Sequence, residues 1–125
     1  MSDAWLRLLL ILIAATTIVS GAAQLFAPDF LLSFIAKEKS PLTLQFFATV
    51  GMFMLITGAM FLQGLLKRSS ETAIPLWIGV QKAAAAGLVA WAIMRGLLLP
   101  IAYGVAAFDA ITAIMTFAFW HRLRR

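Results

Sequence analysis

Residues 5–26, WLRLLLILIAATTIVSGAAQLF, form an apolar run of 22 residues that contains one charge, Arg7. An α-helix rises about 1.5 Å per residue, so a helix of this length crosses a hydrocarbon core of about 30 Å. A cleavable secretory signal is the rival interpretation, because Arg7 precedes the apolar block and VSGA offers small residues to a peptidase. We expect the segment to be retained and to span the membrane.

Three further apolar runs follow along the chain of 125 residues. We predict four membrane spans, at about residues 5–26, 41–66, 75–95 and 100–120. The composition agrees, since 63% of the residues are hydrophobic and 12% are charged, about half the charged fraction of a soluble domain. Backbone polar groups inside a bilayer must be paired within the chain, which favours helices. The sequence therefore predicts an all-α protein, an antiparallel four-helix integral membrane bundle in one transmembrane domain over residues 1–125.

A short amphipathic segment, APDFLLSFIAKEKS at residues 27–40, separates the first two spans. Pro28 is suited to the first turn of a short helix with one apolar and one polar side. We expect this helix to lie in the headgroup plane rather than to cross the bilayer. Ser40 and Pro41 then provide an N-cap and a first helical residue for the second span.

The basic residues indicate how the spans are oriented. The N-terminus, the loop between spans two and three and the C-terminus together carry six Lys and Arg residues, and the opposite side carries three. Because cytoplasmic segments are enriched in Lys and Arg, we expect both termini to be cytoplasmic. The net charge of +5 comes mostly from residues at the ends of the apolar runs, which favours membrane lipids, not nucleic acid, as its partners.

Small residues recur along the spans and predict close helix packing, which drives association in lipid. Six of them stand at spacings suited to a helix interface: Gly51, Gly58, Gly79, Ala83, Gly87 and Gly104. A pore would also need a polar stripe along the spans. The sequence has no such stripe, so packing is the favoured interpretation.

Two ionisable residues lie deep within the spans, Lys82 in the third and Asp109 near the middle of the fourth. Counting from the tight turn between these spans puts the two residues at depths that differ by about 6 Å. A lysine side chain bridges such a distance, so we favour a Lys82–Asp109 pair in which the charges satisfy each other. Two alternatives stay open: Asp109 titrates in proton or ligand transfer, or it faces a partner subunit or lipid while Lys82 reaches the surface. The candidate ligand-contact residues are Gln24, Gln45 and Gln81.

The sequence offers little catalytic chemistry. It has no cysteine, which excludes disulfide exchange, thiolate metal sites and cysteine-ligated iron–sulfur clusters. Its one histidine, His121, lies in the basic tail and cannot by itself form paired haem ligation or a di-metal site. We therefore expect no enzymatic activity, no metal and no obligatory cofactor, with quinone or lipid as conceivable ligands.

The order of these features resembles the DoxX-like small four-helix membrane proteins. The similar elements are the first loop AQLFAPDFLLSFI, the second span PLTLQFFATVGMFMLITGAMFLQG with Gly51 and Gly58, the Trp-containing third span and the ending FWHRLRR. The resemblance extends over almost the whole chain and implies a four-helix bundle associated with a quinone-linked redox system. Where these proteins often carry arginine near the start of the second span, this chain has Gln45, so a site built on that arginine does not carry over.

Three functions fit these observations. We favour a small non-enzymatic integral membrane protein that acts as a subunit or accessory factor of a larger membrane complex, or that associates with itself. Its small size, small-residue helix faces and short loops support this hypothesis. The alternative is a binder or carrier of an apolar ligand such as quinone, sterol or another lipid. The third is a proton-coupled small transporter that depends on Asp109.

Overall fold

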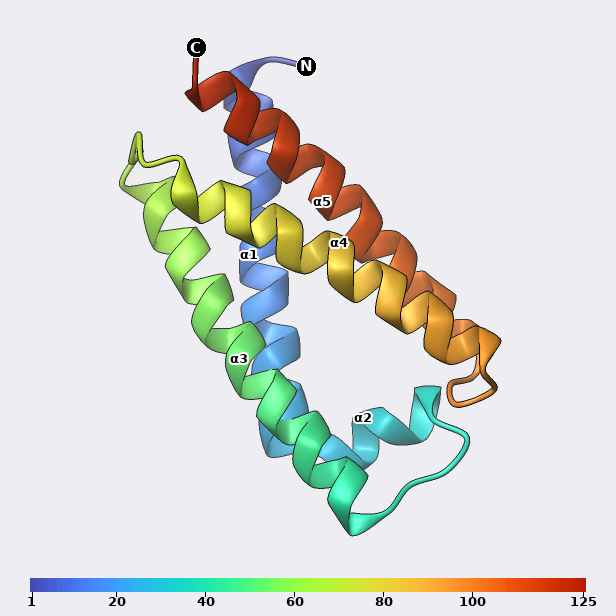
Figure 1. Ribbon diagram of the computed structural model, residues 1–125. Helices are drawn as coiled ribbons and strands as arrows, with labels where there is room; N and C mark the ends of the chain where they lie inside the picture. Colours follow the sequence, from blue (N-terminus) through green and yellow to red (C-terminus); the bar gives the residue numbers. More distant parts are fainter.

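The computed structural model describes all residues, 1–125, and consists of helices joined by short turns (Figure 1). Four helices are long and apolar enough to cross a membrane, which confirms the all-α membrane fold expected from the sequence. A short helix lies between the first two, as predicted. The elements are α1 (Asp3–Phe26), α2 (Pro28–Ile35), α3 (Pro41–Leu66), α4 (Ala73–Met94), the 3-10 turn η1 (Pro100–Ala102) and α5 (Tyr103–Leu123).

Local sequence signals explain where several helices begin. Ser2 caps α1, since its hydroxyl accepts a hydrogen bond from the backbone N–H of Trp5 at 3.2 Å. Ser40 and Thr43 form a reciprocal capping box at the start of α3, and Pro41 is the first residue of that helix, as the sequence predicted.

Two of the long helices end in the same way. At the end of α4 the backbone of Gly96 is left-handed, with φ 78°, and the N–H of Leu97 returns to the carbonyl of Ala92 at 3.0 Å. At the end of α3 the corresponding left-handed residue is Arg68, with φ 53°, and the N–H of Ser69 donates to Gly64 at 3.0 Å. Both ends are Schellman motifs, and only the first has the usual glycine.

The long helices form two antiparallel pairs, α1 with α3 and α4 with α5, which cross and then diverge (Figure 1). The pairs meet at the end that carries both termini, called the closed end here. At the opposite end, called the open end, α2 reaches across to the turn between α4 and α5. There the N–H of Leu99 donates to the carbonyl of Ile35 at 2.6 Å, and that of Lys37 donates to Leu97 at 3.3 Å. Through these bonds α2 connects the two helix pairs and holds them apart at this end.

Glycine allows the backbones of α1 and α3 to touch. A Cβ atom at Gly21 would lie 2.6 Å from the carbonyl oxygen of Gly51, which is closer than any real contact. The buried residues of α1 form one stripe along this side of the helix: Leu6, Leu10, Ala14, Thr17 and Gly21. The α1–α3 pair is therefore packed backbone against backbone.

The closed end holds the main apolar core and several polar links. Leu6, Phe61, Ile78 and Phe119 come from four different helices and are buried together there. The guanidinium of Arg7 donates to the carbonyl of Leu65 at 2.9 Å and joins α1 to the end of α3. An ion pair between Arg122 and Asp3, at 2.8 Å, holds the two termini together.

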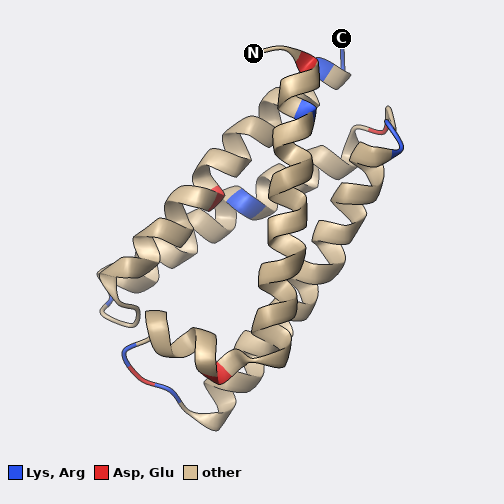
Figure 2. Cartoon of the chain, turned by 180° about the vertical axis from the view of Figure 1, so that it is seen from behind, with Lys and Arg blue, Asp and Glu red and all other residues tan.

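Charged residues lie near the ends of the long helices, with the exception of one oppositely charged pair. Figure 2 shows Lys, Arg, Asp and Glu at the two ends and one acidic and one basic residue midway. Large apolar side chains cover the outer faces, with Leu12 55% exposed and Ile114 70% exposed. Such faces suit contact with lipid tails, which agrees with a multi-pass integral membrane protein.

Candidate functional site

The charged residues midway along the helices meet in one buried cluster. Lys82 on α4 places its Nζ 3.5 Å from an oxygen of Asp109 on α5. The same Nζ donates to the hydroxyl of Thr17 on α1 at 3.0 Å. The side chains of Lys82 and Asp109 are 9% and 13% exposed, so lipid and water have little access to either. One ammonium group therefore links three helices.

The geometry of this cluster favours a fastening role. A charge at the bilayer centre costs about 2.5–3.5 kcal/mol on insertion scales, and pairing offsets part of that cost for both groups. The ring of Phe108 adds a cation–π contact, with its centroid 5.7 Å from Nζ. Since Thr17 belongs to one helix pair and Lys82 to the other, the cluster ties the two pairs together.

The contact of Thr17 with the cluster was not predicted from the sequence, nor was the burial of two further threonines on α5. Thr17 lies on the buried stripe of Leu6, Leu10 and Ala14 along α1, but the other sides of this helix are apolar too, so the sequence does not mark this side for burial. Thr116 on α5 is fully buried, and its hydroxyl has no hydrogen-bond partner in the chain. The same is true of Thr112, one turn closer to Asp109.

The space beside Lys82 is too small for an organic ligand. A cavity of about 10 Å³ is bordered by Thr17, Thr57, Gln81 and Lys82. This volume is comparable to that occupied by one water molecule. Gln81 therefore lies at the cluster, where it can contact a water but no larger ligand.

The other two glutamines do not join this site. Gln24 donates from Nε2 to the backbone carbonyl of Phe47 at 3.1 Å and so helps to hold α1 against α3. The side chain of Gln45 is exposed and makes no hydrogen bond within the chain. Neither Gln24 nor Gln45 therefore forms a hydrogen bond with Lys82 or Asp109, and their role as ligand contacts stays a prediction.

The predicted packing residues fall into two groups. Gly51 and Gly58 lie against α1, and Gly79 lies against the ring of Phe117, where a Cβ would come within 2.7 Å of a ring carbon. Ala83, Gly87 and Gly104 are instead exposed. No atom lies within 4 Å of a Cβ built at either of these last two glycines, so neither makes a close contact within the chain and their part in helix packing stays a prediction.

A much larger cavity lies at the open end. This groove has a volume of about 630 Å³, and eight of its twelve lining residues are hydrophobic. Its polar residues are Lys37, Glu38 and Thr43, which belong to the segment between α2 and α3 and to the start of α3. The apolar wall comes from α2, α3, α4 and the α4–α5 turn: Leu32, Ala36, Phe46, Phe47, Val50, Ala92, Leu97 and Leu98.

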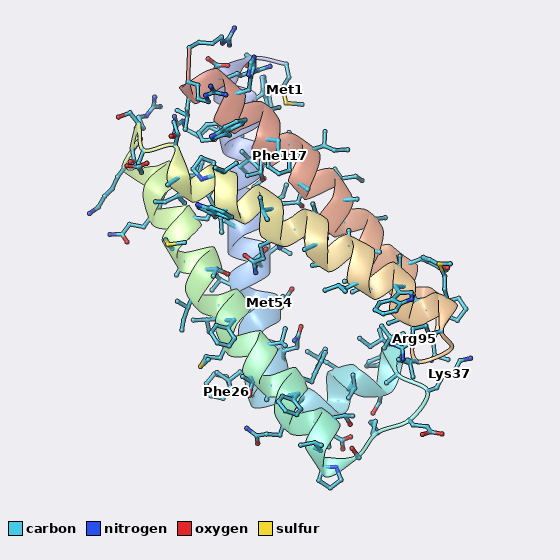
Figure 3. The ribbon with its side chains drawn as sticks, in the orientation of Figure 1. Met1, Phe26, Lys37, Met54, Arg95 and Phe117 are labelled. Atoms are coloured by element: carbon cyan, nitrogen blue, oxygen red, sulfur yellow. The ribbon has the colours of Figure 1, made fainter.

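Lys37 and Arg95 lie at the same corner of the groove region, where α2 meets the α4–α5 turn (Figure 3). The Nζ of Lys37 is 3.9 Å from the position that a Cβ on Gly96 would take. The guanidinium of Arg95 stacks on the ring of Trp91 at 4.8 Å. One end of the groove is thus polar and the remainder apolar, which matches an amphiphilic molecule.

The comparisons with known proteins add no relative. No family model matches the sequence, and neither the curated proteins nor the solved structures include a match. The similarity to DoxX-like proteins therefore stays a hypothesis that rests on the sequence features quoted above. What the chain does must be inferred from the groove and the cluster themselves.

Proposed function

We propose that this integral membrane protein binds an apolar or amphiphilic molecule of the bilayer, of the lipid, quinone or sterol class, in the groove between α3 and α4. The observation that carries the proposal is the groove itself, with its volume of about 630 Å³ and its mainly hydrophobic lining. Binding sites for small molecules commonly have volumes of 300–1,000 Å³ and few polar groups.

The fold supports a groove that stays open. The helix pairs diverge, and the hydrogen bonds from α2 to the α4–α5 turn set the distance between them at this end. Phe46 and Val50 on the wall are 61% and 51% exposed, so a molecule could enter sideways from the hydrocarbon. Because α2 holds the helix pairs apart in this way, we expect the groove to be preformed and not to open only when a ligand binds.

The polarity of the groove favours one orientation of the ligand. Lys37 and Glu38 offer two charges at the end near α2, and the hydroxyl of Thr43 beside them is held in the capping box with Ser40. Val50 and Ala92 form apolar wall farther along α3 and α4. The polar head of a ligand therefore belongs near α2, and its apolar body belongs between the two helices.

The direct test is to purify the protein in mild detergent and identify retained small molecules by mass spectrometry. Ala92→Trp places a large side chain in the groove, and Leu88→Trp places the same side chain on the exposed, groove-free part of α4. We expect a single retained ligand class that is lost in Ala92→Trp and kept in Leu88→Trp. Circular dichroism checks that both variants fold. Equal retention by the two variants would contradict the proposal.

A second candidate is the subunit or accessory role. Ala83 and Gly87 are exposed on α4, and no atom lies within 4 Å of a Cβ built at Gly87. Small residues on a lipid-facing surface are suited to close approach of another membrane helix. The same purification distinguishes the candidates, since a stoichiometric protein partner that is lost in Gly87→Leu favours this role.

A further inference from the structure

A second cavity lies at the closed end, on the side of the molecule where the termini meet. Its volume is about 460 Å³, and it is formed by the first turns of α1 together with the turn after α3. The six lining residues are Asp3, Ala4, Arg7, Leu8, Ile11 and Arg68. This cavity is separate from the groove, which lies at the open end and shares none of these residues.

The cavity carries a net positive charge. The carboxylate of Asp3 is paired with Arg122 at 2.8 Å, which neutralises it. Arg7 donates to the uncharged carbonyl of Leu65 and lies 5.2 Å from the ring of Phe119, so its charge has no acidic partner. Arg68 is exposed and forms no ion pair. Two guanidinium groups thus face the cavity region without counter-charges.

The backbone at Arg68 is unfavourable for arginine. Its φ of 53° is left-handed, a conformation that is unfavourable for an L-residue and that glycine adopts freely. The matching position at the end of α4 is Gly96, with φ 78°. Local strain of this kind is typical of positions kept for a function rather than for stability.

The apolar side of the cavity belongs to the lipid-facing surface of α1. Leu8 is 45% exposed and Leu12, one turn farther along, is 55% exposed. Trp5 is 62% exposed at the same level as the arginines, and exposed tryptophan is characteristic of the membrane–water interface. The cavity therefore presents cations at headgroup depth and an apolar surface directly below them.

We infer that this cavity binds the phosphate of an anionic phospholipid, held by Arg7 and Arg68, with its acyl chains along Leu8 and Leu12. A planar guanidinium matches the geometry of phosphate oxygens and stays charged at every relevant pH. Because this end carries more Lys and Arg than the opposite end, we expect it to be cytoplasmic, and the cytoplasmic leaflet is the anionic one. The inference does not depend on the proposed groove ligand.

The test measures binding of phosphatidylglycerol and phosphatidylcholine to the purified protein by native mass spectrometry and by the shift in unfolding temperature. Arg68→Gln is compared with Arg68→Lys, which keeps the charge, and with Arg125→Gln, which removes an exposed arginine at the same end that does not line the cavity. We expect Arg68→Gln to reduce the preference for phosphatidylglycerol about fivefold, the change that corresponds to about 1 kcal/mol per basic residue. Arg68→Lys should keep most of the preference, and Arg125→Gln should keep all of it.

Arg68→Gly separates binding from folding, because it removes the strain and the charge together. We expect it to unfold at a higher temperature than the wild type in phosphatidylcholine and to lose the additional stabilisation by phosphatidylglycerol. Inorganic phosphate should stabilise none of the proteins. An unchanged phosphatidylglycerol preference in Arg68→Gln, an equal loss in Arg125→Gln, or equal stabilisation by inorganic phosphate would each overturn the inference. Ala92→Trp should leave this binding intact, whichever way the groove test turns out.

Discussion

Removal of the Lys82 ammonium should destabilise the protein more than any surface substitution. Lys82→Met keeps an unbranched apolar stem and deletes the charge that contacts Asp109 at 3.5 Å and the donor to Thr17 at 3.0 Å. The carboxylate of Asp109, 13% exposed, is then left without its partner. Breaking a buried ion pair in this way costs about 3–5 kcal/mol, and insertion scales give about 2.5–3.5 kcal/mol for a lone charge at this depth. We expect Lys82→Met to lower the free energy of unfolding by about 3 kcal/mol.

Asp109→Asn is the second single variant of a double-mutant cycle with Lys82→Met. It keeps the shape of the side chain and leaves the Lys82 ammonium with Thr17 and the Phe108 ring as its contacts. The double variant Lys82→Met/Asp109→Asn contains neither charge and so avoids a lone buried ion. Its loss of stability should be smaller than that of the worse single variant, with a coupling energy of about 2 kcal/mol.

Unfolding by a denaturing detergent in mixed micelles, followed by circular dichroism, measures all four proteins under one condition. Lys39→Met serves as the control, because Lys39 also forms an ion pair with a carboxylate, Asp29, but at the exposed open end. Exposed pairs contribute at most about 1 kcal/mol, so this control should change little. If the losses of the two single variants simply add in the double variant, the two charges do not stabilise each other and the fastening role is refuted.

Three further outcomes follow from the packing and the polar contacts. Gly21→Ala should lower the free energy of unfolding by about 1–3 kcal/mol, because the new methyl group would lie 2.6 Å from a carbonyl oxygen of α3. Gly87→Ala, with open space around it, should be neutral or slightly stabilising, and thermal unfolding in one detergent compares the two variants. Thr116→Val should stabilise the protein by about 1 kcal/mol, because it replaces a buried hydroxyl that has no partner, and the same unfolding measurement checks it. Asp3→Asn should cost less than about 1 kcal/mol, because the Asp3 side chain is 76% exposed in its pair with Arg122, and the effect should disappear in a salt titration.

Length and hydropathy were sufficient to predict the four long helices and the short one between the first two. Helix starts at Ser40 and Pro41 followed from capping preferences alone. The tight turn before α5 also allowed the depths of Lys82 and Asp109 in the membrane to be compared, because the two helices that the turn joins have the same rise per residue. The structure places these two side chains 3.5 Å apart.

The faces along which the helices pack were not predictable in the same way. In a soluble protein the apolar stripe shows which side of a helix is buried, but a span is apolar all round and lacks that signal. Gly79 and Gly87 stand in the same repeat, yet Gly79 meets Phe117 and Gly87 meets nothing within the chain. The difference depends on which helix lies opposite, and so does the contact of Lys82 with Thr17 on α1. For the same reason the divergence of the helix pairs and the groove were not predicted.

The uneven distribution of polar links explains why a groove can persist in this fold. Lipid tails solvate apolar helix faces about as well as another helix does, so separating two apolar faces at the open end costs little free energy. The polar links of Arg7 and Arg122 join the helices at the closed end. The link of Lys82 lies midway along the helices, where hydrocarbon offers no replacement for a lost partner. The open end is joined by backbone bonds from α2 to the α4–α5 turn, which fix a separation rather than close it. A ligand in the groove therefore displaces lipid and breaks no helix contact, so its affinity depends on shape and on the polar residues near α2.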